Sequence, residues 1–152
     1  MYFERMIESA NRRLRAMTDG RYELVRRSVA TNKSAQSGLD LKVRDNYTGK
    51  ERDSGSLSGG ESFKASLALA LGLSDIAQSN AGGIKLDTMF IDEGFGSLDR
   101  QSLQLAIKTL TELSGGDKLI GIISHVDDLK DAIDRKIVVS KGRNGSTLRV
   151  EA

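Results

Sequence analysis

The sequence contains no cysteine and a single histidine, His125, in 152 residues. The absence of cysteine excludes disulfide bonds and thiolate metal sites, and it fits a reducing compartment without establishing one. One histidine is too few for a metal site built from histidine ligands. Proline is absent as well, whereas average usage is about 5%, and nothing in the sequence explains this.

Long apolar runs are also missing. The longest extends from Leu67 to Leu71, with Leu73 beyond it, whereas a membrane-spanning helix needs about 20 apolar residues. No segment resembles a secretory leader, so we expect a cytoplasmic protein. The 38% hydrophobic and 29% charged content is that of one globular domain, long enough for a real core.

The net charge of +2 is too small to indicate a nucleic-acid-binding protein. The charge is unevenly distributed, because residues 1–52 carry 12 Lys/Arg against 7 Asp/Glu, whereas residues 53–152 carry 11 against 14. The basic first third either contacts a phosphate backbone or is simply a basic face in water.

The first third of the chain predicts one helix and two strands. Residues 1–18 predict the helix, with apolar residues alternately four and three apart at Phe3, Ile7, Ala10, Leu14 and Met17. This is heptad spacing, but two heptads are too few to distinguish a coiled coil from an ordinary amphipathic helix. Strands are predicted over 21–29 and 39–44, with a polar loop at 31–37. The charged segment 46–55 predicts a mobile loop that buries nothing.

The second half alternates between helices and strands. An apolar helix over residues 62–78 is predicted to be buried on nearly every side, and apolar runs at 89–91 and 119–123 predict buried strands. The other predicted elements are helices over 99–113 and 126–133 and strands over 136–140 and 148–150. This alternation predicts an α/β sheet, with an antiparallel pair at the front of the chain.

The run from Met89 to Ile91 ends in two adjacent carboxylates, Asp92 and Glu93, followed by a glycine-spaced turn and Asp99. Successive strand residues point to opposite faces, so the two carboxylates cannot do the same job. One can hold Mg²⁺ through its water shell while the other faces a nucleophile, a division that suits phosphoryl transfer. The alternative is a core strand that ends in an exposed acidic turn.

Ser58-Gly59-Gly60 directly precedes the apolar helix. The glycines leave backbone N–H groups uncovered, and the helix N-terminus adds positive potential, so this segment predicts a phosphate site. The alternative is a plain N-cap, for which serine and glycine are favoured in any case.

His125 follows the strand at 119–123, as Asp92 and Glu93 follow theirs. Ligands of open α/β sheets bind beyond the carboxyl ends of the strands, so we expect these three residues to converge on one edge. The alternatives are a structural histidine and, for Asp99, an ordinary helix N-cap.

A phosphate-binding loop of the form G-x-x-x-x-G-K-[ST] is absent. Gly49-Lys50 is the only Gly-Lys pair, but Arg44 stands where the first glycine is required, and Glu51 follows the lysine. The chain therefore has the water-activating residues of an ATPase and lacks the loop that binds the nucleotide's phosphates.

The motifs occur in the order found in ABC-type ATPases. Segments 57–61, 90–93, 94–99 and 124–125 resemble the signature motif, Walker B, D-loop and switch histidine of that superfamily. The sequence Asp-Glu-Gly-Phe-Gly-Ser-Leu-Asp differs from the corresponding motif of transporters. It resembles the SMC-like branch, and within it the SbcC family, the ATPase subunits of bacterial SbcCD double-strand-break exonucleases.

The resemblance implies an α/β fold, the C-terminal lobe of an ABC-type ATPase head, with a P-loop NTPase-like sheet and flanking helices. Residues 1–18 would be the end of a coiled-coil root, and residues 19–152 the head lobe. In that family the Walker A loop lies in an N-terminal lobe beyond a long coiled coil. The chain is therefore expected to be a C-terminal fragment that is catalytically silent alone.

The resemblance also implies roles for individual residues, with ATP and Mg²⁺ as ligands. Asp92 would support Mg²⁺, Glu93 would polarise the attacking water, and His125 would contact the γ-phosphate. The residues that would bind the ATP of an opposite subunit, or communicate across the dimer, are Ser58, Gly59, Gly60, Glu61 and Asp99.

The implied partners are the N-terminal lobe of the same subunit, a second SbcC-like subunit in an ATP-dependent head dimer, an SbcD-like nuclease and double-stranded DNA, but no membrane. One rival interpretation is a nucleotide-binding fragment of another ABC ATPase, such as a transporter. The other is a non-catalytic structural or DNA-binding module.

Overall fold

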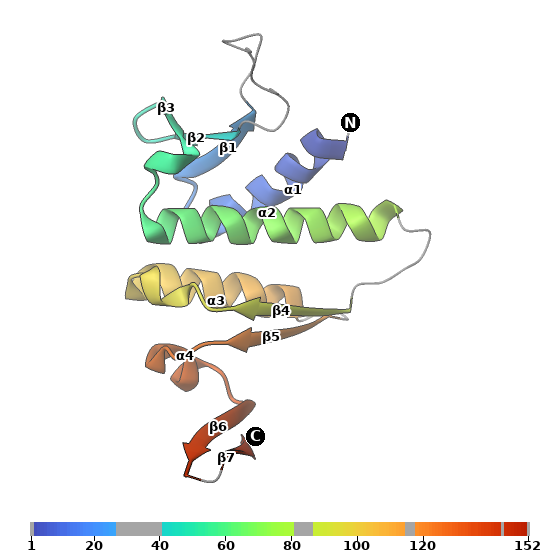
Figure 1. Cartoon of the computed structure of the whole chain (residues 1–152). Helices are drawn as coiled ribbons and strands as arrows, with labels where there is room; N and C mark the ends of the chain where they lie inside the picture. Colours follow the sequence, from blue (N-terminus) through green and yellow to red (C-terminus); the bar gives the residue numbers. More distant parts are fainter. Residues whose placement is uncertain (1, 27–40, 81–86, 115–117, 144, 152) are drawn as a thin grey trace.

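The computed structural model describes residues 2–26, 41–80, 87–114, 118–143 and 145–151. Its elements stack in layers (Figure 1). An antiparallel sheet lies on one side of the long helix α2, helix α3 with two parallel strands lies on the other, and helix α1 packs against both α2 and α3. A short helix and a β-hairpin follow at the C-terminal end.

Helix α1 (Tyr2–Met17) confirms the predicted first helix and packs against α2 (Gly59–Asn80). From its second turn onward the heptad-like residues are buried: Ile7, Ala10, Leu14 and Met17. A Cβ on Gly72 would lie 2.7 Å from Met6 O and 2.9 Å from Ala10 N, so the two helices approach closely because position 72 has no side chain. That α1 ends a coiled coil stays a prediction.

Three strands form an antiparallel sheet in the order β1-β2-β3: β1 (Tyr22–Arg26), β2 (Leu41–Asp45) and β3 (Lys50–Asp53). The first two confirm predicted strands; residues 27–40, which include the predicted loop at 31–37, lie outside the described part. The Asn11 side chain joins α1 to β1, because it donates to Leu24 O at 2.9 Å and accepts from Leu24 N at 2.7 Å.

The mobile loop predicted over residues 46–55 is wrong. A turn, strand β3 and a 3-10 helix, η1 (Ser54–Ser56), occupy this segment. Gly49 provides the turn with a positive φ of 69°, and an ion pair across β2 and β3 joins Arg44 Nη2 to Glu51 Oε1 at 2.9 Å. Because charged residues form this hairpin, it lacks the apolar periodicity from which the other strands were predicted.

In the second half, β4 (Thr88–Asp92) and β5 (Leu119–Ile123) pair in parallel, with Ile91 opposite Ile122. Helix α3 (Arg100–Ser114) connects them. It buries an apolar stripe against the core: Leu103, Ala106 and Leu110. These three elements confirm the predicted ones to within one residue, since each has a strong apolar pattern.

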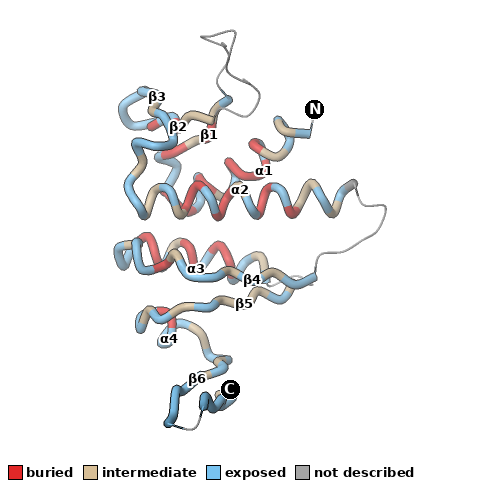
Figure 2. Tube along the Cα trace, viewed as in Figure 1, coloured by how far each residue is buried: buried red, intermediate tan, exposed pale blue. Residues whose placement is uncertain are grey.

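The prediction that both strands are buried is wrong for this chain (Figure 2). Phe90, Leu119 and Ile123 are 71%, 66% and 54% exposed. The residues that pack against the core alternate with them: Met89, Ile91, Ile120 and Ile122. Helix α2 is likewise open at Leu73, which is 57% exposed. The strands have apolar residues on both faces, but the described chain covers only one of them.

Helix α4 (Asp127–Ala132) precedes a hairpin of β6 (Lys136–Gly142) and β7 (Gly145–Glu151), which confirms the last predicted helix and strands. One face of the hairpin carries cross-strand apolar neighbours, each 68–71% exposed: Ile137 with Val150 and Val139 with Leu148. Nothing in the described part of the chain combines the length and apolar character of a membrane-crossing helix.

We predict that Gly72→Ala destabilises the chain. Helix propensity alone would make this change stabilising by about 1 kcal/mol. The added Cβ would instead push α1 away from α2, and overpacking of this kind costs about 1–3 kcal/mol. Denaturant unfolding measures the difference. Ser66→Ala, at an exposed position of the same helix, is the matched control, and a Gly72→Ala chain as stable as wild type would show that the helices do not depend on this contact.

Candidate functional site

The carboxyl ends of β4 and β5 bring two of the predicted residues together. Glu93 follows β4, and its N–H donates to Ile123 O at 2.9 Å. His125, two residues beyond β5, places Nδ1 3.0 Å from Glu93 Oε2 and 3.2 Å from Oε1. Both side chains are exposed, His125 by 81% and Glu93 by 51%. The predicted convergence of these two residues is confirmed, and Asp92 ends β4 at the same sheet edge.

Glu93 has a left-handed backbone, with a φ of +57°, and Gly94 follows with a φ of +95°. A non-glycine residue in this region costs about 1–3 kcal/mol and persists only where the surrounding structure enforces it. Strand alternation therefore does not set the direction of the Glu93 side chain. The turn sets it and aims the carboxylate at His125.

Asp92 and Glu93 are the residues of this edge that could support Mg²⁺. Among the described residues, no group of three or more His, Cys, Asp or Glu side chains is arranged to hold a metal ion. Mg²⁺ is usually bound by one or two carboxylates together with waters and substrate phosphates. The exposed carboxylates fit that mode of binding, with the nucleotide supplying the remaining ligands.

The N-terminus of α2 is closed by a capping box. Ser58 Oγ accepts from Glu61 N at 3.3 Å, and Ser58 N donates to Glu61 Oε2 at 2.8 Å. The N-cap interpretation of Ser58 is thus correct as a structural description. Because Ser58 and Gly59 remain exposed, the helix N-terminus is also open to an anion.

Glu61 has more partners than a capping residue requires. Its carboxylate also accepts hydrogen bonds from Tyr22 Oη of β1 and from Arg52 Nη2 of β3, the latter at 3.3 Å. Burial acts to raise the pKa of Glu61, but the hydrogen bonds from Tyr22, Ser58 and Arg52 outweigh it and lower the pKa to about 2. Burial and the neighbouring carboxylate raise the pKa of Tyr22. Glu61 is therefore charged and ties the front sheet to α2.

Asp99 caps α3. Its Oδ1 accepts from Ser102 N at 2.8 Å and its Oδ2 accepts from Ser102 Oγ at 3.1 Å, which lowers the pKa of Asp99. Ser102 Oγ also accepts from Lys64 Nζ at 2.9 Å. Lys64 lies on α2 and is buried, so this chain of hydrogen bonds joins the starts of two helices.

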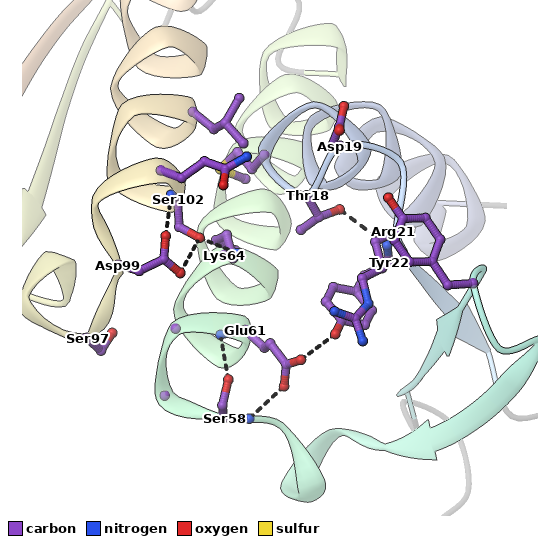
Figure 3. A pocket seen from close by; sticks show the side chains of 16 residues that line it. Thr18, Asp19, Arg21, Tyr22, Ser58, Glu61, Lys64, Ser97, Asp99 and Ser102 are labelled. Atoms are coloured by element: carbon purple, nitrogen blue, oxygen red, sulfur yellow. Dashed lines mark hydrogen bonds between the residues drawn. The ribbon is translucent and has the colours of Figure 1, made fainter.

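A cavity of about 560 Å³ opens between the end of α1 and the starts of α2 and α3 (Figure 3). It is lined by all five residues predicted to bind nucleotide: Ser58, Gly59, Gly60, Glu61 and Asp99. Asp92, Glu93 and His125 do not line it. The predicted site residues therefore form two groups, one at the sheet edge and one in the cavity.

Sequence reasoning missed several residues that shape these groups. Lys64 had a signal, since a lysine inside an apolar helix is rarely buried without a polar partner. The sequence gives no local signal for Tyr22 and Arg52, because their contacts with Glu61 join residues 39 and 9 positions apart. Arg21 lines the cavity and stacks on Tyr47, with its guanidinium carbon 5.5 Å from the ring centre.

Comparison with known proteins identifies relatives of this chain. The family model described as "SbcC/RAD50-like, Walker B motif" matches residues 30–112. The SbcC subunit of the nuclease SbcCD from Vibrio cholerae is 57% identical over 141 residues, which is 93% of this chain and 14% of that protein. The protein of the same name from Staphylococcus aureus (strain JH9) is 46% identical over 148 residues, which is 97% of this chain and 14% of that protein.

The chain thus spans 14% of the length of these curated relatives. A solved SMC ATPase, described for ATP-driven dimerisation and DNA-stimulated activation, matches with a TM-score of 0.77 and 16% identity over 99% of this chain and 85% of that one. At this identity the likeness shows the fold alone, and it confirms the predicted ABC-type head lobe. With the family model covering more than half of its residues, the chain belongs to the SbcC/RAD50-like family.

Proposed function

We propose that the chain is the C-terminal head lobe of an SMC-like ATPase that couples ATP binding and hydrolysis to DNA double-strand-break processing by a partner nuclease. The observation that carries this proposal is the Glu93–His125 pair, 3.0 Å apart at the edge of the parallel strands. The names of the relatives, which place them in the nuclease SbcCD, support the coupling to a nuclease.

At the sheet edge, Glu93 takes the proton of the attacking water as general base. The Glu93 carboxylate is half-exposed and lies against the His125 ring, so a water molecule can reach its basic oxygen from the solvent side. His125 holds the carboxylate in place and, being 81% exposed, is free to reach the γ-phosphate. Asp92 would help to hold Mg²⁺, and the ion would supply positive charge to neutralise the phosphates.

The cavity at the start of α2 serves a different nucleotide. Since Ser58, Gly59 and Gly60 line the cavity while Glu93 and His125 do not, one head offers its catalytic edge to one ATP and its helix N-terminus to another. Two heads then enclose each nucleotide between them. A relative in fold is described for ATP-driven dimerisation, which agrees with this arrangement.

The exposed apolar sides of the β4-β5 sheet and of the β6-β7 hairpin are covered by the N-terminal lobe of the same protein, which also supplies the phosphate-binding loop. Large exposed apolar patches mark interaction surfaces, and β4 to β7 expose seven large apolar residues: Phe90, Leu119, Ile123, Ile137, Val139, Leu148 and Val150. The curated relatives have ample further chain to supply such a lobe, because this chain spans 14% of their length.

The remaining partners follow from the same family. We propose an SbcD-like nuclease and double-stranded DNA as partners, and a cytoplasmic location. The family match disfavours a transporter fragment. A purely structural module stays the second candidate, supported by the absence of a phosphate-binding loop in this sequence.

We predict that this chain alone does not hydrolyse ATP. Without a phosphate-binding loop the β- and γ-phosphates lack their main backbone cradle. Phosphate release from purified chain with Mg²⁺ and ATP should match a blank. Mg²⁺-dependent hydrolysis that Glu93→Gln abolishes would contradict this prediction.

In the full-length protein, we predict that Glu93→Gln lowers hydrolysis by about 10²- to 10⁴-fold, the usual contribution of a general base. ATP affinity should survive, and an ATP-bound dimer should accumulate, detectable by size-exclusion chromatography. Asp92→Asn is the matched comparison and should instead weaken Mg²⁺-dependent ATP binding. Wild-type turnover by Glu93→Gln would remove the proposed role of the sheet edge.

We predict that Ser58→Arg in the full-length protein leaves ATP binding nearly intact but blocks ATP-driven dimerisation. The larger, charged side chain would fill the open start of α2. Ser66→Arg, exposed two turns further along the helix, is the control and should dimerise normally. If Ser58→Arg dimerises as well as wild type, Ser58 is an N-cap and nothing more.

A further inference from the structure

The strained turn at Glu93 needs support on two sides. Glu93 has a positive φ of +57°, and a non-glycine residue keeps such a backbone only where its neighbours enforce it. On one side the hydrogen bond from Glu93 N to Ile123 O, 2.9 Å, holds the turn to β5. The support on the other side comes from α2.

Phe63, in the second turn of α2, packs its ring directly on the Gly94 backbone. A Cβ added to Gly94 would overlap Cε2 and Cδ2 of this ring. Glycine is therefore required at position 94 for two reasons, the left-handed φ and the ring that lies where a side chain would start. The ring thus leaves the Gly94 backbone no room on the side of α2.

The same ring also holds the next residue of the turn. Phe63 and Phe95 pack edge to face, with ring centres 4.8 Å apart and planes at 61°, a favourable geometry for aromatic pairs. Phe95 is fully buried at 0% exposure and begins the 3-10 helix η2 (Phe95–Ser97). One turn earlier on α2, a Cβ on Gly60 would lie 2.9 Å from Ser97 O. The start of α2 thus lies against the whole segment after Glu93.

We infer that Phe63 is a positioning residue for Glu93, whose ring keeps the Glu93–Gly94 turn in the conformation that places the carboxylate 3.0 Å from His125. This inference rests on the proposed role of Glu93 as general base. Phe63 touches no reacting atom, so it acts on the rate of hydrolysis and not on the binding of ATP.

The test uses Phe63→Leu in the full-length protein, because leucine stays apolar and loses the flat ring. We expect kcat to fall roughly 10- to 100-fold with KM nearly unchanged, since a misplacement of about 1 Å can cost about 100-fold. Leu69→Ala, a half-buried position further along α2, loses apolar contact away from the turn and should keep the wild-type kcat. A wild-type kcat for Phe63→Leu would overturn the inference.

A double-mutant cycle separates positioning from general destabilisation. In a Glu93→Gln background there is no base left to position, so Phe63→Leu should have little further effect on the residual rate. An equal fractional loss in both backgrounds would show a merely structural role and overturn the inference. Wild-type hydrolysis by Glu93→Gln alone would overturn the proposed function instead.

A second substitution, Phe63→Met, tests the inference if Phe63→Leu folds poorly. Phe63→Met keeps an apolar side chain that adapts to irregular space but has no ring to lie on Gly94. The same loss in kcat, and the same absence of loss in the Glu93→Gln background, is expected. Phe63→Met with wild-type kcat would overturn the inference independently.

Discussion

The carboxylate of Glu61 accepts hydrogen bonds from the Ser58 backbone, from Tyr22 of β1 and from Arg52 of β3. Two of these partners lie in the antiparallel sheet and the third directly precedes α2, so one charge holds the start of α2 to the sheet. Everything that α2 later positions depends on this attachment: the close approach to α1 at Gly72, the cavity, and the ring of Phe63 on Gly94. The pKa of about 2 keeps that charge in place at any physiological pH.

The division of the site into two groups follows from the same geometry. Helix α2 begins at the cavity, and its second turn reaches the segment after β4, so one helix borders both groups without merging them. Neither group is a complete nucleotide site. Among the described residues, the edge has the proposed base Glu93 and a second carboxylate, Asp92, and the cavity has an open helix N-terminus. Under the proposed function, each group would be completed by a surface from another part of the protein or from a second head.

Helices and parallel strands could be predicted from the sequence because each carries a strong apolar period. Strand β3 could not, since it is held by charge pairs such as Arg44–Glu51 that leave no such period. The exposure of Phe90 and Leu119 was missed for a different reason, because an apolar strand does not say whether its cover lies in the same chain. Motif order located Glu93 and His125. The contacts of Tyr22 and Phe63 are distant in sequence and had no local signal.

The exposed apolar residues of β4 to β7 bear on both the stability of the fold and its proposed function. Burying a large apolar side chain contributes about 1.5–3 kcal/mol, and β4 to β7 leave seven of them exposed. Their combined burial is comparable to the net stability of a domain, about 5–15 kcal/mol. The N-terminal lobe that we propose would stabilise the folded state by mass action, so completing the nucleotide site and stabilising the fold would be one equilibrium. Under the proposed function, the exposed apolar residues of β4 to β7 would serve stability and nucleotide binding together, whereas Glu93, half-exposed at the edge, would serve the chemistry alone.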